Sequence, residues 1–166
     1  YRYRKLLLAT GGVPRTLPIP GGDLEGICYF RTLDDYLKLR KGSTEGKKAV
    51  IMGGGFIGSE IAAAMAINKI DVTMIFPESY LVSRVFPEYL GKALLSQFLS
   101  RGIKVLVNEK PSAFSKEGDT FTTYTESGKK IESDMVIIGI GIAPSHTIAQ
   151  ALKKAGVDFR VCGQAV

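Results

Sequence analysis

Apolar residues in this chain gather in short continuous runs that alternate with stretches of helical spacing. Four of the runs have the length and the branched side chains of buried strands, at residues 48–52, 71–76, 103–107 and 135–140. Residues 56–68 repeat Ile57, Ile61 and Met65 on one helical face. A second apolar helical face follows Pro87, a residue well suited to a helix start. Strands alternating with helices predict a parallel sheet.

The remaining pattern predicts shorter elements. Thr32 can cap a helix that runs to about Arg40, with Asp34 and Asp35 near its positive end. Three short polar–apolar segments separated by glycine-containing turns predict an antiparallel meander, at residues 112–115, 120–125 and 130–132. The other expectations are a buried strand, a proline-rich extended linker and a short helix, at residues 5–9, 13–22 and 145–155.

Composition narrows the class of protein. The 166 residues are enough for one domain with a substantial core, and no apolar run reaches the roughly 18–20 residues that span a bilayer. The formal charge of +6 comes from scattered Lys and Arg, so solubility is favoured over a nucleic-acid surface. Cys28 and Cys162 form no paired motif, which favours reduced thiols in the cytoplasm or a mitochondrion. His146 is interpreted as a surface or capping residue rather than a catalyst.

The strongest chemical signal is the glycine-rich turn at residues 53–58, between the first of the four strands and its helix. Gly53 permits a tight turn, Gly55 lets a phosphate approach the backbone, and Gly58 lets helix and strand pack closely. The helix start offers free N–H groups and partial positive charge. This context predicts a dinucleotide site; another glycine-rich turn in an unrelated α/β protein is the alternative.

The end of the second strand bears on cofactor choice. An acidic residue there usually binds the adenosine ribose, and Phe76 cannot do so. Glu78 lies two residues further on, and its carboxylate would repel a 2′-phosphate, which favours NADH over NADPH. Arg84 could soften that preference. Glu78 as an ordinary exposed carboxylate, and Arg84 as a solvated side chain, remain open.

With these residues in view, the chain resembles the NAD domain of the FAD-dependent pyridine nucleotide oxidoreductases. The resemblance covers nearly all of the chain and is carried by the glycine turn, by residues 71–78 and 86–90, and by the segment at 139–144. It points to the branch that includes ferredoxin reductase, monodehydroascorbate reductase and apoptosis-inducing factor. Its implied fold is α/β: a Rossmann-like parallel sheet with helices on both faces and an antiparallel three-stranded meander crossover.

The resemblance also implies roles for individual residues. Phe56 would lie beside the nicotinamide, Glu60 would bind the carboxamide end, and Gly141 would contact the cofactor through its backbone. From the residues alone, packing and helix-dipole roles for Phe56 and Glu60 stay equally open. The expected cofactor-binding set, with no catalytic residue and no metal ligand, is Gly53, Gly54, Gly55, Phe56, Ile57, Gly58, Glu60, Glu78, Arg84, Ile140 and Gly141.

The implied organisation places residues 1–22 in a strand and linker from an adjoining FAD domain, and residues 23–166 in the NAD(H)-binding domain. The implied reaction passes hydride from NADH to FAD, bound mostly outside this chain, and then to an unidentified acceptor. The chain alone would bind dinucleotide without redox activity, with the FAD domain of the same polypeptide as its neighbour. The alternative is a non-enzymatic nucleotide-sensing or interaction module of the apoptosis-inducing factor type.

Overall fold

The computed structural model describes residues 4–145 and 147–158. Contacts within the chain divide it into two compact units. One unit comprises residues 14–141, and the other comprises residues 4–13 together with the described residues after 141. The larger unit holds the glycine turn.

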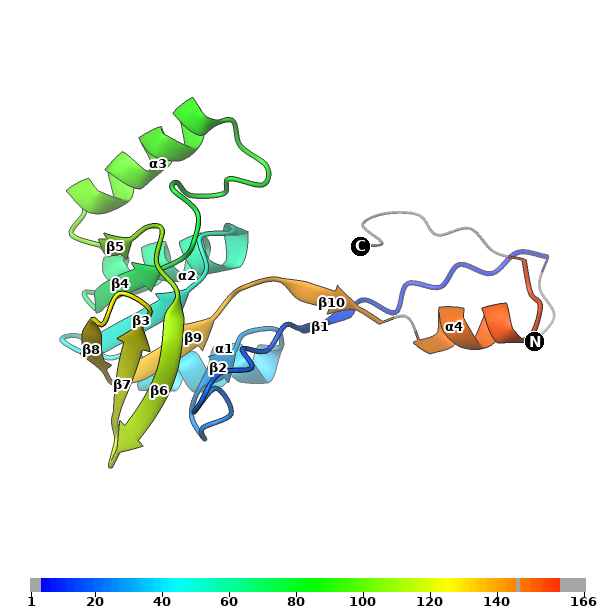
Figure 1. Cartoon of the computed structure of the whole chain (residues 1–166), viewed down its shortest axis with the longest axis horizontal. Helices are drawn as coiled ribbons and strands as arrows, with labels where there is room; N and C mark the ends of the chain where they lie inside the picture. Colours follow the sequence, from blue (N-terminus) through cyan, green and yellow to red (C-terminus); the bar gives the residue numbers. More distant parts are fainter. Residues whose placement is uncertain (1–3, 146, 159–166) are drawn as a thin grey trace. The chain divides into compact units, whose positions relative to one another are not determined.

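A five-stranded parallel sheet forms the centre of the larger unit, in the order β2-β9-β3-β4-β5 (Figure 1). Its strands are β2 (Cys28–Tyr29), β3 (Lys48–Met52), β4 (Asp71–Ile75), β5 (Lys104–Leu106) and β9 (Met135–Ile138). The middle strands are almost wholly buried, as their continuous apolar runs predict. All four runs predicted as strands are confirmed. The strand β2 was not predicted.

The three helices of this unit cover one face of the sheet. They are α1 (Leu33–Gly42), α2 (Phe56–Ile67) and α3 (Glu88–Ser100). Their apolar side chains share one core cluster with the sheet residues Ala49, Ile51, Val72 and Met74. Thr32 caps α1 as predicted, because its hydroxyl accepts from the Asp35 N–H while the Asp35 carboxylate accepts from the Thr32 N–H. Pro87 takes the N-cap position of α3.

The meander covers the opposite face and is confirmed as antiparallel, in the order β6-β7-β8. Its strands are β6 (Pro111–Glu117), β7 (Thr120–Thr125) and β8 (Lys130–Ser133). Phe114 and Phe121 pack against Val50, Val136 and Ile138 to form the second core cluster. The α/β fold class is therefore confirmed. One detail differs from expectation: the three helices lie on one face, because the meander already buries the apolar side chains of the other.

The segment at residues 14–22, part of the predicted extended linker at 13–22, packs within the larger unit. Leu17 and Ile19 pack against the second core cluster. The Pro20 carbonyl accepts a hydrogen bond from the Phe114 N–H at 2.8 Å, and the Tyr29 hydroxyl donates to the Gly22 carbonyl at 2.9 Å. The prolines fix φ in this segment, which ends in turns at residues 20–23, and its backbone is hydrogen-bonded to the meander.

The smaller unit contains a two-stranded sheet of β1 (Gly12–Pro14) and β10 (Ile142–Pro144), and the helix α4 (Thr147–Lys154). The predicted C-terminal helix is confirmed. The prediction of a buried strand at residues 5–9 is wrong: the segment is exposed, with Leu7 at 86 %. Within the described residues no strand pairs with it, and a run of apolar residues needs paired neighbours to be buried as a strand. No helix in the described part is long and apolar enough to cross a membrane.

Candidate functional site: the glycine turn

The glycine turn begins where β3 ends, at the carboxyl edge of the parallel sheet. Gly53 has φ 110°, a left-handed backbone that favours glycine, and its N–H donates to the Ile75 carbonyl at 2.9 Å. A Cβ on Gly53 would lie 2.4 Å from the Gly139 carbonyl oxygen. The turn therefore joins the ends of three neighbouring strands, β3, β4 and β9, which is the edge where ligands bind in open parallel sheets.

Gly54 and Gly58 are required for packing. A Cβ on Gly58 would lie 2.1 Å from the Gly53 carbonyl oxygen, so only glycine allows α2 to start this close to β3. A Cβ on Gly54 would meet the Phe76 ring at 2.8 Å. Phe76 is almost fully buried. The contact between Gly54 and Phe76 could not be predicted from the sequence, because Gly54 follows β3 and Phe76 follows β4.

Gly55 differs from these glycines because the space beside it is open. A Cβ built on Gly55 meets nothing within 4 Å, and the residue is exposed. It is the N-cap of α2 with no side-chain cap, so the first-turn N–H groups of the helix have no capping side chain. Such an uncapped helix start attracts anions. The shape and the donors of this position fit a phosphate group.

Three predicted site residues follow near the start of α2. Phe56 is 51 % exposed, and its ring meets the edge of the Phe86 ring with a centroid distance of 5.9 Å and an interplanar angle of 88°. Ile57 is half-buried and Glu60 is exposed. Phe56 is thus a surface aromatic at the helix start and not a core residue, which excludes the packing alternative for it.

The loop at residues 77–86 connects β4 to α3 and carries Glu78, half-buried, and Arg84, exposed. Val82 fixes this loop to the glycine turn, because its N–H donates to the Gly54 carbonyl at 2.7 Å. Val82 is buried and has φ 54°, a conformation that costs energy for a β-branched residue. Sequence reasoning missed Val82, since nothing in its local pattern marks a left-handed valine.

The last predicted residues follow β9. Gly139 donates its N–H to the Met52 carbonyl at 2.8 Å, which extends the sheet to the start of the turn. Ile140 is half-buried, and Gly141 is exposed with φ 102°. The glycine turn, the start of α2 and the end of β9 are therefore joined directly, and the loop at 77–86 is bonded to the same turn. The assignment of these residues to cofactor binding stays a prediction.

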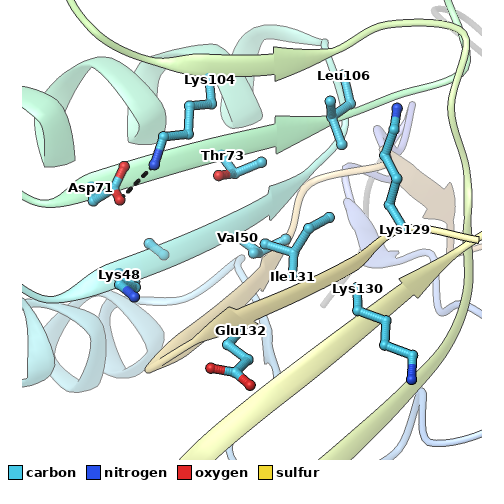
Figure 2. A pocket seen from close by; sticks show the side chains of 11 residues that line it. Lys48, Val50, Asp71, Thr73, Lys104, Leu106, Lys129, Lys130, Ile131 and Glu132 are labelled. Atoms are coloured by element: carbon cyan, nitrogen blue, oxygen red, sulfur yellow. Dashed lines mark hydrogen bonds and ion pairs between the residues drawn. The ribbon is translucent and has the colours of Figure 1, made fainter.

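Two cavities lie away from the glycine turn. One, of about 520 Å³, lies between α1 and α2 and includes Tyr36, Leu39 and Ile61 in its walls. The other, of about 470 Å³, lies at the amino ends of β3, β4 and β5, against β8. Figure 2 shows that Lys129 and Lys130 in this cavity point apart, while Lys104 is paired with Asp71 at 2.7 Å. These ammonium groups do not converge on a common point, as an anion site would need.

The remaining candidate groups are two cysteines and one histidine. His146 and Cys162 lie outside the described residues. Cys28 is a free thiol in β2, and burial raises its pKa to about 11. Within residues 4–145 and 147–158 no group of three His, Cys, Asp or Glu side chains could hold a metal ion. The features that could bind a ligand at the carboxyl edge are therefore backbone N–H groups, Phe56 and the charges of Glu60, Glu78 and Arg84.

Comparison with known proteins places this geometry in a family. Residues 1–164 match the family described as pyridine nucleotide-disulphide oxidoreductase. The chain belongs to this family. It is 38 % identical to monodehydroascorbate reductase 2, peroxisomal, of Oryza sativa subsp. japonica, over 98 % of the chain and 36 % of that protein. It is 34 % identical to rubredoxin-NAD(+) reductase of Pseudomonas putida, over 90 % of the chain and 39 % of that protein.

A solved structure gives the same result. The reductase structure described as the covalent putidaredoxin reductase-putidaredoxin complex matches with a TM-score of 0.83 and 29 % identity, over 90 % of this chain and 37 % of that one. The predicted family is confirmed, as is its oxidoreductase character. The chain spans between a third and two fifths of the length of these relatives.

Proposed function

We propose that this chain is the NADH-binding domain of an FAD-dependent oxidoreductase. The observation that carries the proposal is Gly55: an exposed N-cap with open space where a side chain would lie, at the uncapped start of α2. A pyrophosphate fits there because the helix start supplies N–H donors and partial positive charge. The family supports the same reading, and one relative is named for NAD(+).

Each end of the dinucleotide would meet different residues. Glu78 would accept hydrogen bonds from the adenosine ribose, and Arg84 would contact the same end. Phe56, Glu60, Ile140 and Gly141 would surround the nicotinamide, with Phe56 covering it and excluding water. On this proposal none of these groups acts as an acid or base, and the chain's contribution is to bind and orient.

The activity of the whole protein follows from this role. NADH held by Gly55, Phe56, Glu60 and Glu78 would supply a hydride to a flavin, which would be bound mostly by a neighbouring domain of the same polypeptide. The electron acceptor is a separate molecule; relatives are named as reductases of monodehydroascorbate and rubredoxin, and one is solved in complex with putidaredoxin. Residues 1–13 would lead in from the FAD domain, and the NAD domain would begin near residue 14 rather than at 23, because Leu17 and Ile19 pack in its core. The chain alone would bind dinucleotide without redox turnover.

Calorimetric titration with NADH and with NADPH tests the proposal. We expect NADH to bind more tightly, and Glu78→Gln to narrow the difference by about 1–3 kcal/mol, the scale of a hydrogen bond to a charged group. Glu117→Gln, at an exposed position on β6, is the control and should leave both affinities unchanged. Absence of NADH binding by the wild-type chain would overturn the proposal. Equal affinities for the two nucleotides would remove Glu78 from the ribose site.

The alternative is a nucleotide-sensing or interaction module without redox turnover, as the resemblance to apoptosis-inducing factor suggests. The visible spectrum of the full-length protein separates the two. Bound flavin that is bleached by NADH supports the oxidoreductase, whereas NADH binding without a flavin spectrum supports the sensor.

A further inference from the structure

Phe56 has a specific aromatic neighbour in Phe86. Their rings meet edge to face, with centroids 5.9 Å apart and planes at 88°, the arrangement that aromatic pairs prefer. Phe56 itself is half exposed and sits on the first turn of α2. Its ring therefore has little core packing to hold it, and the contact with Phe86 restricts its orientation.

Phe86 is the better anchored of the two rings. It is half-buried and packs against the core cluster on the helix-covered face of the sheet. Its N–H donates to the Val82 carbonyl at 2.9 Å, and the Val82 N–H donates to the Gly54 carbonyl at 2.7 Å. Leu81 and Val82 are both buried, which fixes the loop backbone beneath Phe86. This asymmetry makes Phe86 the support and Phe56 the supported ring.

The loop that carries Phe86 also carries Glu78, at the other end of the proposed nucleotide site. The Glu78 carbonyl accepts a hydrogen bond from the Asn108 N–H at 3.2 Å, so this end of the loop is tied to the segment after β5. The middle of the loop is bonded to the glycine turn through Val82. One loop, fixed at several points, thus carries both Glu78, the proposed ribose residue, and Phe86, which contacts Phe56.

We propose that Phe86 is a positioning residue that holds the Phe56 ring over the nicotinamide end of the site. The inference rests on the proposed NADH-binding function and deepens it, because it explains how an exposed aromatic can present one face to a ligand. Loss of Phe86 leaves the phosphate and ribose contacts intact and weakens only the contacts that Phe56 makes.

The first test reads the Phe56 ring without any nucleotide. In the protein carrying 4-fluorophenylalanine at position 56, Phe86→Leu should shift the fluorine resonance, and Phe86→Tyr should largely preserve it. Val85→Ala, an exposed position in the same loop, is the matched control and should leave the resonance in place. A resonance that is unchanged in Phe86→Leu would overturn the proposal whether or not the protein binds NADH.

The second test compares NADH with ADP-ribose, which lacks the nicotinamide. Phe86→Leu should weaken NADH binding by about 2- to 10-fold, the factor that aromatic-pair energies imply, and leave ADP-ribose affinity unchanged. In a Phe56→Ala background the same substitution should have no effect on either ligand. Equal weakening of both ligands, or the same loss of NADH affinity without Phe56, would show that Phe86 is merely structural. If wild type binds neither ligand, the proposed function fails, while the fluorine result still decides the positioning.

Discussion

Neighbouring glycines in the turn serve different physical purposes, which can be separated residue by residue. Gly53 supplies a left-handed backbone, and Gly54 and Gly58 leave room for Phe76 and for the Gly53 carbonyl. Gly55 alone faces open space. The roles of Gly53 and Gly58 were predicted from spacing, because the strand–turn–helix context fixes their geometry. The role of Gly54 and the left-handed backbone of Val82 could not be predicted from the sequence, because both depend on residues that only folding brings together.

Gly55→Val should therefore separate binding from folding. Its φ of −82° suits any residue and its Cβ is unobstructed, so the free energy of unfolding should change by less than about 1 kcal/mol. The branched side chain would occupy the phosphate position, and NADH affinity should fall by about 10- to 100-fold, as expected for lost hydrogen bonds to a charged group. Calorimetry and urea unfolding measure the two effects.

Gly58→Val is the contrasting variant. Its Cβ would lie 2.1 Å from the Gly53 carbonyl oxygen, so α2 must move away from β3. The unfolding free energy should fall by about 1–3 kcal/mol.

Unchanged NADH binding by a folded Gly55→Val protein would contradict the assignment of the phosphate position to Gly55.

Cys28 gives a second prediction for a single residue. Burial raises the pKa of its thiol from 9.0 to about 11, so at pH 8 the reactive thiolate is scarcer than for an ordinary thiol by about 100-fold. In a Cys162→Ser background, an aromatic disulfide reagent should react with the folded protein about 100-fold more slowly than with the protein in urea. Comparable rates in the two states would show that Cys28 is not shielded.

At the scale of elements, the sequence predicted most clearly the strands and turns whose own residue pattern is enough to identify them. The apolar runs that became β3, β4, β5 and β9 have the continuous burial of a parallel sheet, and the hairpin turns located the meander. The strand β2 has only two residues and is defined by its register with β9, where Cys28 pairs with Ile137. Residues 5–9 show the reverse case, an apolar run with the pattern of a buried strand and no partner among the described residues.

Glu109 ties the meander together, and its behaviour should depend on pH. The Ser127 hydroxyl donates to its carboxylate, and the N–H groups of Ser127 and Lys110 do so at 3.2 and 3.3 Å; these bonds lower the pKa of Glu109. A lowered folded-state pKa means that its stabilisation is present above the unfolded value, near 4.3, and is lost as pH falls through the folded value.

Urea unfolding at pH 7 and at pH 3 measures this effect. Glu109→Gln should be less stable than wild type at pH 7, and the difference should shrink as the pH is lowered to 3, because protonation of the wild-type carboxyl removes the stabilisation. Glu117→Gln, at an exposed position on β6 of the same meander, should differ little in stability from wild type at either pH. A difference for Glu109→Gln that grows on acidification would show that the bonds do not favour the charged form.

At the scale of the whole molecule, the core belongs to one unit. Both hydrophobic clusters consist of residues between 14 and 141, including Leu17 and Ile19. A chain of residues 14–141 should therefore keep the unfolding free energy and NADH affinity of the full chain within about 1 kcal/mol.

A chain of residues 23–166 loses Leu17 and Ile19, and also the Pro20 carbonyl that accepts from Phe114. Full burial of two branched side chains contributes about 3–6 kcal/mol; Leu17 and Ile19 are partly buried, so the loss should be smaller than this, but the second chain should still be less stable. Urea unfolding of the three chains decides the boundary: if residues 23–166 are as stable as residues 14–141, then the segment at 14–22 adds nothing to the core and the boundary at 23 is the better one.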